Sequence, residues 1–162
     1  MHSSRHPLDS PRPRSPSQVD FQSIFEASPH ACLLLAADEL DITILGVNEA
    51  YLRATMRQRD DLVGSRLFEA FPDNPDDPDA DGVRKLHASL GRVLQTRAAD
   101  RMETQKYDIP RPAVQGGGFE VRYWEPLNTP VFGADGELAF IVHQVEDVTA
   151  REVEKRSARE TL

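Results

Sequence analysis

The sequence has little cysteine, a deficit of positive charge and no long apolar run. Its 162 residues include one cysteine, Cys32, which excludes an internal disulfide and any metal cluster built from cysteines alone. Lys and Arg number 19 against 27 Asp and Glu, and the resulting net charge of -8 argues against binding to nucleic acid or to an anionic membrane. The longest uncharged apolar run, at 31–37, is far shorter than the ~20 residues of a membrane-spanning helix.

The composition and the two ends of the sequence predict one soluble domain with two extensions. The N-terminus lacks the apolar segment of a signal peptide, so we expect a reducing, cytoplasmic location and no membrane span. Residues 1–18 are rich in Pro and Ser and show no apolar periodicity, which predicts a disordered tail. The rest of the chain is long enough for one domain, expected at 19–148, followed by a C-terminal helix at 149–162.

Apolar spacing predicts five strands and the helices between them. The strands are expected at 30–37, 42–47, 102–109, 119–127 and 138–148. Helices are expected at about 20–28, directly after Asn48, at about 83–97 and from Thr149 onward. Asn48 is expected as the structural N-cap of the second helix and Asp81 as the cap of the third, and Thr149 is expected to form a capping box with Glu152. Because strands pair at both ends of the domain and helices lie between them, the pattern predicts an α+β fold with one antiparallel sheet.

Four short motifs follow one another along residues 20–150. They are Phe25-Glu26-Ala27-Ser28-Pro29, Val47-Asn48-Glu49-Ala50-Tyr51, Leu62-Val63-Gly64-Ser65-Arg66-Leu67-Phe68 and Glu146-Asp147-Val148-Thr149. In this order they resemble the first helix, a strand-to-helix step, a glycine turn and the last strand-to-helix junction of the PAS sensory domain family. The chain therefore resembles a PAS domain over most of its length.

The resemblance implies a five-stranded antiparallel sheet in the order 2-1-5-4-3, with helices over one face, flanking helices at both ends, and a cavity between sheet and helices. In this family the cavity holds a haem, a flavin, a small metabolite or no ligand. Members commonly form homodimers and lie upstream of an output domain such as a histidine kinase, for example in bacterial two-component systems. The last helix would transmit the signal, with Asp147 and Thr149 as relay residues.

The residues expected to line the cavity, or to contact a small ligand, come from the strands and from the helices between them. They are Cys32, Leu34, Phe68, Phe71, Leu86, His87, Leu90, Tyr107, Tyr123, Ile141 and His143. Strand alternation places Tyr123 on the face opposite to Trp124, and it places His143 on the face of Ile141. Alternation alone leaves open which face lines the cavity.

Three features of the sequence are candidates for binding a cofactor or a metal ion. His87 lies on the helix that supplies the axial histidine of haem-binding PAS sensors, and a solvated or hydrogen-bonded histidine at the groove edge is the competing interpretation. Cys32 lacks the Asn-Cys-Arg-Phe context of light-sensing flavin relatives, so we expect a small core residue and no flavin. The acidic loop 72–82 starts like a calcium loop, but Ala88 stands where a bidentate Glu is needed, so no metal site is expected.

The sequence favours a sensory module over an enzyme. It contains no kinase histidine motif and no nucleotide-binding loop, so we expect a non-catalytic domain that acts with a histidine kinase or is a fragment of one. An enzyme would need a carboxylate and a proton-transfer partner in one apolar pocket, and the candidates are Glu125, Tyr123 and His143. A third alternative is a ligand-free interaction or dimerisation module with a filled cavity.

Overall fold

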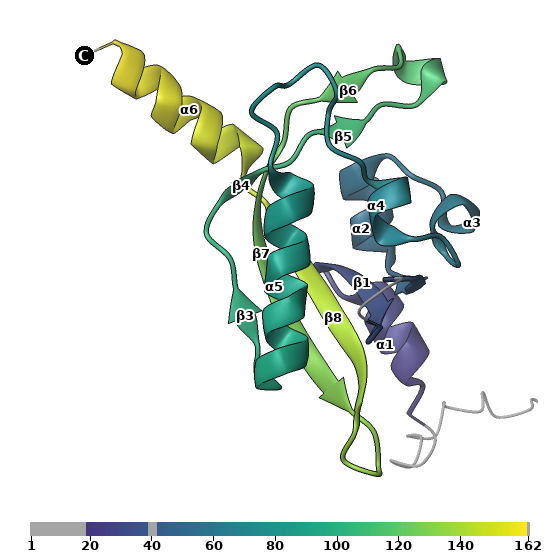
Figure 1. The fold of residues 1–162 in the computed structure, drawn as a ribbon. Helices are drawn as coiled ribbons and strands as arrows, with labels where there is room; N and C mark the ends of the chain where they lie inside the picture. Colours follow the sequence, from purple (N-terminus) through teal and green to yellow (C-terminus); the bar gives the residue numbers. More distant parts are fainter. Residues whose placement is uncertain (1–18, 39–41, 162) are drawn as a thin grey trace, which may run out of the picture.

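The computed structural model describes residues 19–38 and 42–161, so the tail predicted at 1–18 lies outside the described residues (Figure 1). The helices are α1 (Phe21–Ala27), α2 (Glu49–Thr55), α3 (Arg59–Leu62), α4 (Leu67–Ala70), α5 (Gly82–Thr96), the 3-10 helix η2 (Ala113–Gln115) and α6 (Thr149–Glu160). The strands are β1 (Ala31–Ala36), β2 (Ile44–Val47), β3 (Asp100–Arg101), β4 (Gln105–Lys106), β5 (Ile109–Pro110), β6 (Phe119–Glu120), β7 (Tyr123–Phe132) and β8 (Leu138–Asp147).

An antiparallel sheet in the order β2-β1-β8-β7-β3, with β4 also paired to β7, forms the framework of the domain. The predicted order 2-1-5-4-3 is confirmed, because β8 and β7 are the fifth and fourth expected strands, and β3 with β4 takes the place of the third. Helix α5 crosses the sheet over β7 and β8, and α2 and α4 pack into the same core beside it (Figure 1). The expected α+β class is confirmed as well.

Strand register determines which side chains enter the core. Leu33 of β1 lies opposite His143 of β8, and Ile141 follows His143 on the same face. All three side chains are buried beneath the helices. Because successive residues of a strand point to opposite faces, Cys32 and Leu34 lie on the outer face of the sheet, away from α5.

The prediction of one continuous third strand at 102–109 is wrong. The chain makes two short pairings with β7, at β3 and at β4, and then leaves the sheet, so that β5 pairs only with β6. Pro110 and Pro112 have no N–H to give to a ladder, and Gly116, Gly117 and Gly118 adopt positive φ angles at the turn before β6. The chain therefore forms a small separate hairpin there.

The fourth predicted strand, 119–127, lies further along the chain than expected. Strand β7 begins at Tyr123 and continues through Pro126 and Pro130 to Phe132. The carbonyl oxygen of Pro126 accepts a hydrogen bond from the backbone N–H of Met102, at 3.0 Å, on the side of β3. The nitrogen of Pro126, which carries no hydrogen, therefore points to the side of β3 and β4, where pairing is interrupted. The hydrogen bonds between β7 and β8 do not need it, so that pairing continues past Pro126.

Helix α5 presents Leu86, Leu90 and Val93 to the core, whereas His87 is exposed. The predicted cap at Asp81 is wrong in its chemistry, because the Asp81 carboxylate forms an ion pair with Lys85 at 2.9 Å and caps no backbone N–H. The N–H of Val83 instead donates to Oδ1 of Asp73, at 3.1 Å. The acidic loop thus supplies the cap from a residue further back in the chain.

Candidate functional site

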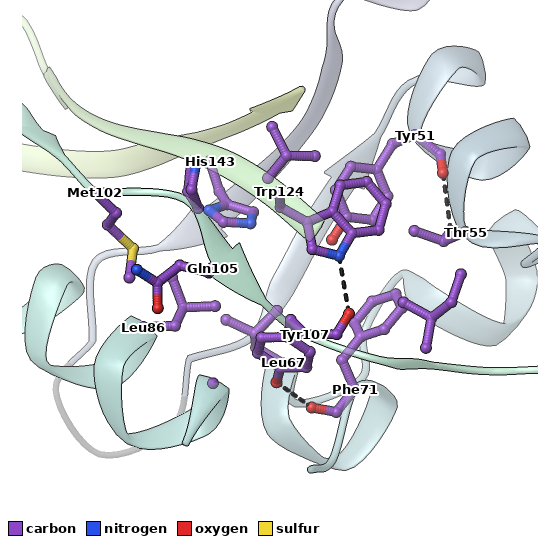
Figure 2. Close-up of a pocket in the computed structure, with 14 residues that line it drawn as sticks. Tyr51, Thr55, Leu67, Phe71, Leu86, Met102, Gln105, Tyr107, Trp124 and His143 are labelled. Atoms are coloured by element: carbon purple, nitrogen blue, oxygen red, sulfur yellow. Dashed lines mark hydrogen bonds between the residues drawn. The ribbon is translucent and has the colours of Figure 1, made fainter. Parts of the chain in front are cut away.

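A pocket of about 40 Å³ lies between the core face of the sheet and helices α2, α4 and α5 (Figure 2). Its lining residues come from these helices and from the strands at the C-terminal side of the sheet. They are Tyr51, Thr55, Leu67, Phe71, Gly82, Leu86, Met102, Gln105, Tyr107, Ile109, Trp124, Pro126, His143 and Val145. No Asp, Glu, Lys or Arg is among them, so the pocket is largely apolar and carries no fixed charge.

Aromatic rings form one wall of the pocket. The rings of Tyr51 and Phe71 meet edge to face, with their centroids 5.9 Å apart. The indole N–H of Trp124 donates to the carbonyl oxygen of Tyr107, at 2.9 Å, and the Tyr107 hydroxyl donates to the carbonyl oxygen of Phe71 (Figure 2). Burial raises the pKa of both Tyr51 and Tyr107 above the ordinary tyrosine value, so both phenols are neutral.

His143 is the one histidine among the lining residues, and it is buried. Burial lowers the pKa of its imidazole from an ordinary value of 6.5 to about 4. Its Nδ1 lies 2.7 Å from Oδ1 of Asn128 on the neighbouring strand. The amide nitrogen of Asn128 donates to the hydroxyl oxygen of Ser89 on α5, at 2.9 Å. One ring nitrogen of His143, Nδ1, is therefore hydrogen bonded within the protein.

The hydrogen-bonded chain continues from Ser89 to the surface. The Ser89 hydroxyl lies 2.5 Å from Oδ2 of Asp100, and Arg92 donates to the same carboxylate at 2.9 and 3.1 Å. The hydrogen bond from Arg92 is the largest cause of the lowered pKa of Asp100. Ser89 and Asn128 are fully buried, so a continuous polar path crosses the core from the pocket to an exposed arginine.

The structure brings four of the sequence-predicted cavity residues together: Phe71, Leu86, Tyr107 and His143. It places the others elsewhere. Cys32 and Leu34 lie on the outer face of β1, and Leu90 and Ile141 lie in the core away from the pocket. His87 and Phe68 face each other outside the pocket, with ring centroids 6.0 Å apart. Tyr123 lies on the outer face beneath Arg156, whose guanidinium carbon is 4.8 Å from the ring centroid.

Several lining residues were missed at the level of sequence, above all Tyr51, Met102, Gln105 and Trp124. Tyr51 stands in the second family-like motif, which the resemblance assigns to a strand-to-helix step and not to the pocket. Trp124 and Tyr123 are both buried, so hydrophobicity alone could not identify Trp124 as the residue that faces the pocket.

The geometry bears directly on the cofactor candidates. His87 is exposed and does not line the pocket. Cys32 is buried outside the pocket, and burial raises the pKa of its thiol, so the unreactive protonated form is favoured. The described residues include no group of three His, Cys, Asp or Glu placed to hold a metal ion. The enzyme candidates do not converge either, because Glu125 and Tyr123 lie on the outer face and His143 on the core face.

A second polar cluster joins the end of the sheet to the start of α6. Oδ1 of Asp147 accepts hydrogen bonds from the backbone N–H of Thr149, at 3.0 Å, and from its hydroxyl, at 2.5 Å. The hydroxyl oxygen of Thr149 in turn accepts from the backbone N–H of Tyr123, at 3.0 Å. Arg122 donates to the other Asp147 oxygen at 2.7 Å. We call these four residues the strand–helix junction.

The capping box predicted for Thr149 and Glu152 is wrong. Val148 is the N-cap of α6 and its own side chain caps no N–H, and the Thr149 hydroxyl is turned to Asp147 and Tyr123. The carboxylate of Asp147 instead accepts from the N–H of Thr149, the first residue of the helix. The predicted relay residues, Asp147 and Thr149, therefore contact each other and the first residue of β7. From this junction α6 projects away from the rest of the domain (Figure 1).

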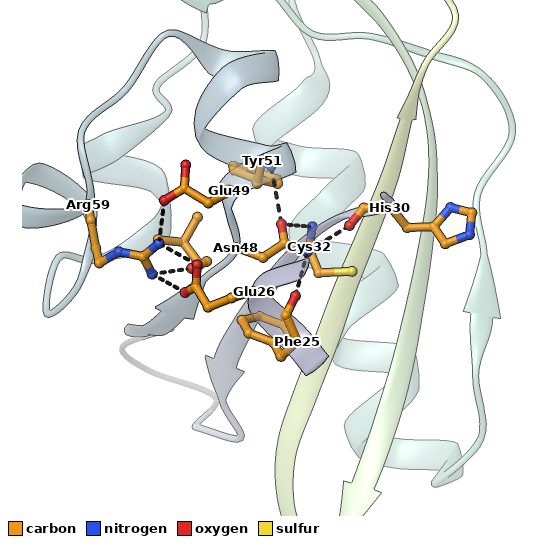
Figure 3. Close-up of polar contacts among 9 residues, drawn as sticks. Phe25, Glu26, His30, Cys32, Asn48, Glu49, Tyr51 and Arg59 are labelled. Carbon is orange, nitrogen blue, oxygen red and sulfur yellow. Dashed lines mark hydrogen bonds and ion pairs between the residues drawn. The ribbon is translucent and has the colours of Figure 1, made fainter. Parts of the chain in front are cut away.

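Asn48 holds the N-terminal elements together (Figure 3). As the N-cap of α2, its Oδ1 accepts from the backbone N–H groups of Tyr51 and Cys32, at 3.1 and 3.0 Å. Its Nδ2 donates to the carbonyl oxygens of His30, at 2.7 Å, and Phe25, at 3.2 Å. One buried side chain thus links α1, β1 and α2, and it supports the pocket through the position of Tyr51.

The comparisons with known proteins agree with this architecture. A sequence model described as "PAS fold" matches residues 25–153. The PAS domain of a protein from Colwellia psychrerythraea is similar in structure, with a TM-score of 0.57 and 11% identity, over 80% of this chain and 95% of that one. A sensory box sensor histidine kinase from Vibrio cholerae gives a TM-score of 0.52 and 19% identity, over 80% and 88% of the two chains.

A third similar structure is that of an RNA-binding Light-Oxygen-Voltage receptor, with a TM-score of 0.62 and 16% identity, over 87% of this chain. This chain spans 36% of the length of that receptor. No curated protein matches the sequence. Among the described residues, no helix is long and apolar enough to cross a membrane.

Proposed function

The chain belongs to the PAS family, and from this premise we propose that it is a sensory module in which a small ligand in the pocket changes the position of α6. The ligand binds on the core face of the sheet. The signal leaves through the strand–helix junction to an output domain, of which a histidine kinase is the leading candidate. The domain itself carries out no catalysis.

The observation that carries this proposal is the placement of Tyr123 and Trp124. Trp124 lines the pocket, and its indole holds the carbonyl of Tyr107 at the pocket wall. The backbone N–H of Tyr123, the preceding residue, donates to the hydroxyl oxygen of Thr149, and its carbonyl oxygen accepts a hydrogen bond from the N–H of Val148, at 2.9 Å. A ligand that displaces the backbone at Trp124 would therefore also displace the backbone of Tyr123, to which the start of α6 is hydrogen bonded.

Self-association is part of the proposed mechanism. The outer side of β1, β7 and β8 carries an outer apolar face, which we define as Leu34, Val131, Phe140 and Val142. Phe140 is 38% exposed. At the edge of this face, helix α1 leaves Phe21 and Ile24 exposed. We propose that a second copy of the chain covers this surface, because exposed apolar side chains gathered on one face of a sheet mark an interaction site.

A ligand-free interaction module is the second candidate, and the small size of the cavity favours it. A volume of about 40 Å³ holds only a few water-sized groups, so side chains already fill most of the space. In this alternative, α6 and the outer apolar face would still act, and the pocket would be a part of the core with a minor packing gap.

Native mass spectrometry combined with amide hydrogen exchange tests the two candidates. A mass increment from a bound small molecule, together with altered exchange in α6 when it is removed, supports the sensory module. We expect Thr149→Val to leave ligand binding unchanged and to abolish the response of α6. Thr161→Val, at the far end of that helix, is the matched control and should preserve the response, because within the described residues the Thr161 hydroxyl bonds only to carbonyls of its own helix. A pocket that stays empty in a dimeric protein would support the ligand-free alternative.

A further inference from the structure

The hydrogen-bonded chain His143–Asn128–Ser89–Asp100 has only one consistent direction. Arg92 and the carboxylate of Asp100 fix its outer end, because a guanidinium only donates and a carboxylate only accepts. The single hydroxyl proton of Ser89 must then point to Asp100, across the 2.5 Å contact. The Ser89 oxygen is left as an acceptor for the amide nitrogen of Asn128.

The direction of the chain fixes the tautomer of His143. With its amide nitrogen on Ser89, Asn128 turns its oxygen to the imidazole, so Nδ1 of His143 must carry the proton. The opposite amide orientation would set the Asn128 oxygen 2.9 Å from a Ser89 oxygen whose proton is already used. Burial lowers the pKa of His143 to about 4, so the ring is neutral near pH 7 and its Nε2 carries a lone pair.

The remaining polar side chains of the pocket are engaged except for Tyr51, whose ring lies edge to face with that of His143 at a centroid distance of 6.3 Å and whose hydroxyl makes no hydrogen bond to another described residue. The side chains of Thr55, Gln105, Tyr107 and Trp124 each donate to a backbone carbonyl. Among the described residues, none donates to Nε2 of His143. The lining also contains no charged side chain that could pair with an ion. A charged ligand would lose its hydration without compensation, whereas a neutral one would not.

Resting on the proposed function, we propose that the pocket takes a small, uncharged molecule with an O–H or N–H group that donates a hydrogen bond to Nε2 of His143. The apolar body of the ligand packs against Trp124 and Leu86, and its O–H or N–H group is the feature by which the pocket distinguishes it from other apolar molecules. The chain through Asn128, Ser89 and Asp100 is thus a specificity device, because it keeps the pocket-facing nitrogen of His143 an acceptor. Carboxylates, phosphates and ammonium compounds are excluded as ligands.

Two probes of nearly equal shape test the proposal on the intact chain. Pyrrole is a neutral ring with an N–H donor, and furan is the corresponding ring with an oxygen in its place, so the pair differs mainly in the donor. Both are small, as the cavity requires. We expect pyrrole to bind at least ten-fold more tightly than furan by NMR titration, and to shift the Nε2 resonance of His143. Equal binding, or tighter binding of furan, would overturn the proposal.

The tautomer is measured separately, without any ligand. Two-bond proton–nitrogen correlations of the imidazole should show His143 protonated at Nδ1, and a ring protonated at Nε2 would contradict the inference. His143→Phe should abolish the preference for pyrrole, while His87→Phe, outside the pocket, should preserve it. The outcomes also separate the two proposals. A native ligand without a donor leaves the sensory function standing and overturns this inference, whereas pyrrole selectivity without any response of α6 supports the inference and overturns the sensory function.

Discussion

The ring of Tyr107 occupies the space that a side chain at Gly82 would need. A Cβ added at Gly82 would lie 2.4 Å from Cδ2 of Tyr107. Gly82 is the first residue of α5, and the Tyr107 hydroxyl donates to the carbonyl of Phe71. The start of α5 and one wall of the pocket are therefore packed against each other with no room for a methyl group.

We predict that Gly82→Ala destabilises the protein by about 1–3 kcal/mol, because the ring of Tyr107 must move. Gly91→Ala is the matched control, since a Cβ at Gly91 meets nothing within 4 Å. In the middle of the same helix this change should stabilise the protein by about 0.5–1 kcal/mol. Urea unfolding followed by tryptophan fluorescence reports on the pocket directly, because the protein has a single tryptophan, Trp124. If both variants were stabilised alike, the packing of Tyr107 against Gly82 would be refuted.

The burial of His143 predicts that stability falls in mild acid. Its pKa is about 4 in the folded protein against an ordinary value of 6.5, so between these two pH values the unfolded chain binds a proton that the folded protein does not. The stabilising contribution is complete above pH 6.5 and is lost as the pH falls to 4. By linkage the loss is roughly 3 kcal/mol.

Urea unfolding between pH 7.5 and 4 measures this slope, and His143→Gln should remove most of it. The lowered pKa values of Asp100 and Asp77 act only near the acid end of this range, since the ordinary value of an aspartate is 3.8, and both carboxylates are present in both proteins. They therefore contribute equally to both proteins in the tested window. An unchanged slope in His143→Gln would show that His143 is protonated in the folded state without cost.

Asn48 should be among the most sensitive positions of the fold. Its side chain makes four hydrogen bonds to backbone groups in a fully buried site. Asn48→Ala leaves buried donors and acceptors unpaired, and we expect a loss of at least about 3 kcal/mol. Asn48→Asp keeps the two accepted hydrogen bonds, loses the two donated ones and buries a charge, so it should be similarly destabilising.

Glu26→Gln is the comparison for this site. Glu26 forms a two-point ion pair with Arg59 at 2.5 and 2.7 Å, at a partly exposed position beside Asn48 (Figure 3). Such a pair is expected to contribute about 1 kcal/mol or less. Chemical denaturation of the three variants gives the ranking, and a loss at Glu26 that equals or exceeds the loss at Asn48 would contradict the assignment of Asn48 as the central polar link.

The sequence predicted those features that depend on local patterns. Asn48 is the N-cap of α2, as predicted from its position before an apolar helical segment, and the strand order is the one implied by the family resemblance that the four ordered motifs carry. The interruption of the third strand was not predictable from apolar content, because Met102 and Ile109 are both buried although only short stretches near them pair with the sheet. Burial and strand pairing are separate properties, and the sequence reports mainly the first.

The polar path from the pocket could not be predicted, because it depends on residues distant in the chain. Ser89 and Asn128 are 39 residues apart, and Asn128 and His143 are 15 apart. Their contact requires the register of β7 against β8 and the rotation of α5, neither of which a single sequence specifies. In the sequence alone, His87 attracts more attention than Ser89, yet the helix turns Ser89 inward and His87 to solvent.

The outer apolar face leads to the last prediction, which concerns oligomeric state. Phe140 stands directly opposite Val131 on this face, and Leu34 stands opposite Val142. Leu34 continues the face to Gly46, where a Cβ would lie 3.4 Å from that of Leu34 and 3.8 Å from the ring of Phe25 in α1. We expect Phe140→Glu to convert a homodimer into monomers, because each copy would bring a charge into an apolar contact. Light scattering after size exclusion measures the mass.

Val114→Glu is the matched control for this change. Val114 is 94% exposed in η2, at the tip of the β5–β6 hairpin, so it is as apolar as the tested surface but lies away from it. This variant should keep the mass of the unmodified protein. Phe140 is itself partly exposed, so Phe140→Glu should unfold at nearly the same urea concentration when measured as a monomer. A Phe140→Glu protein that stays dimeric, or a Val114→Glu protein that dissociates, would place the dimer contact elsewhere on the molecule.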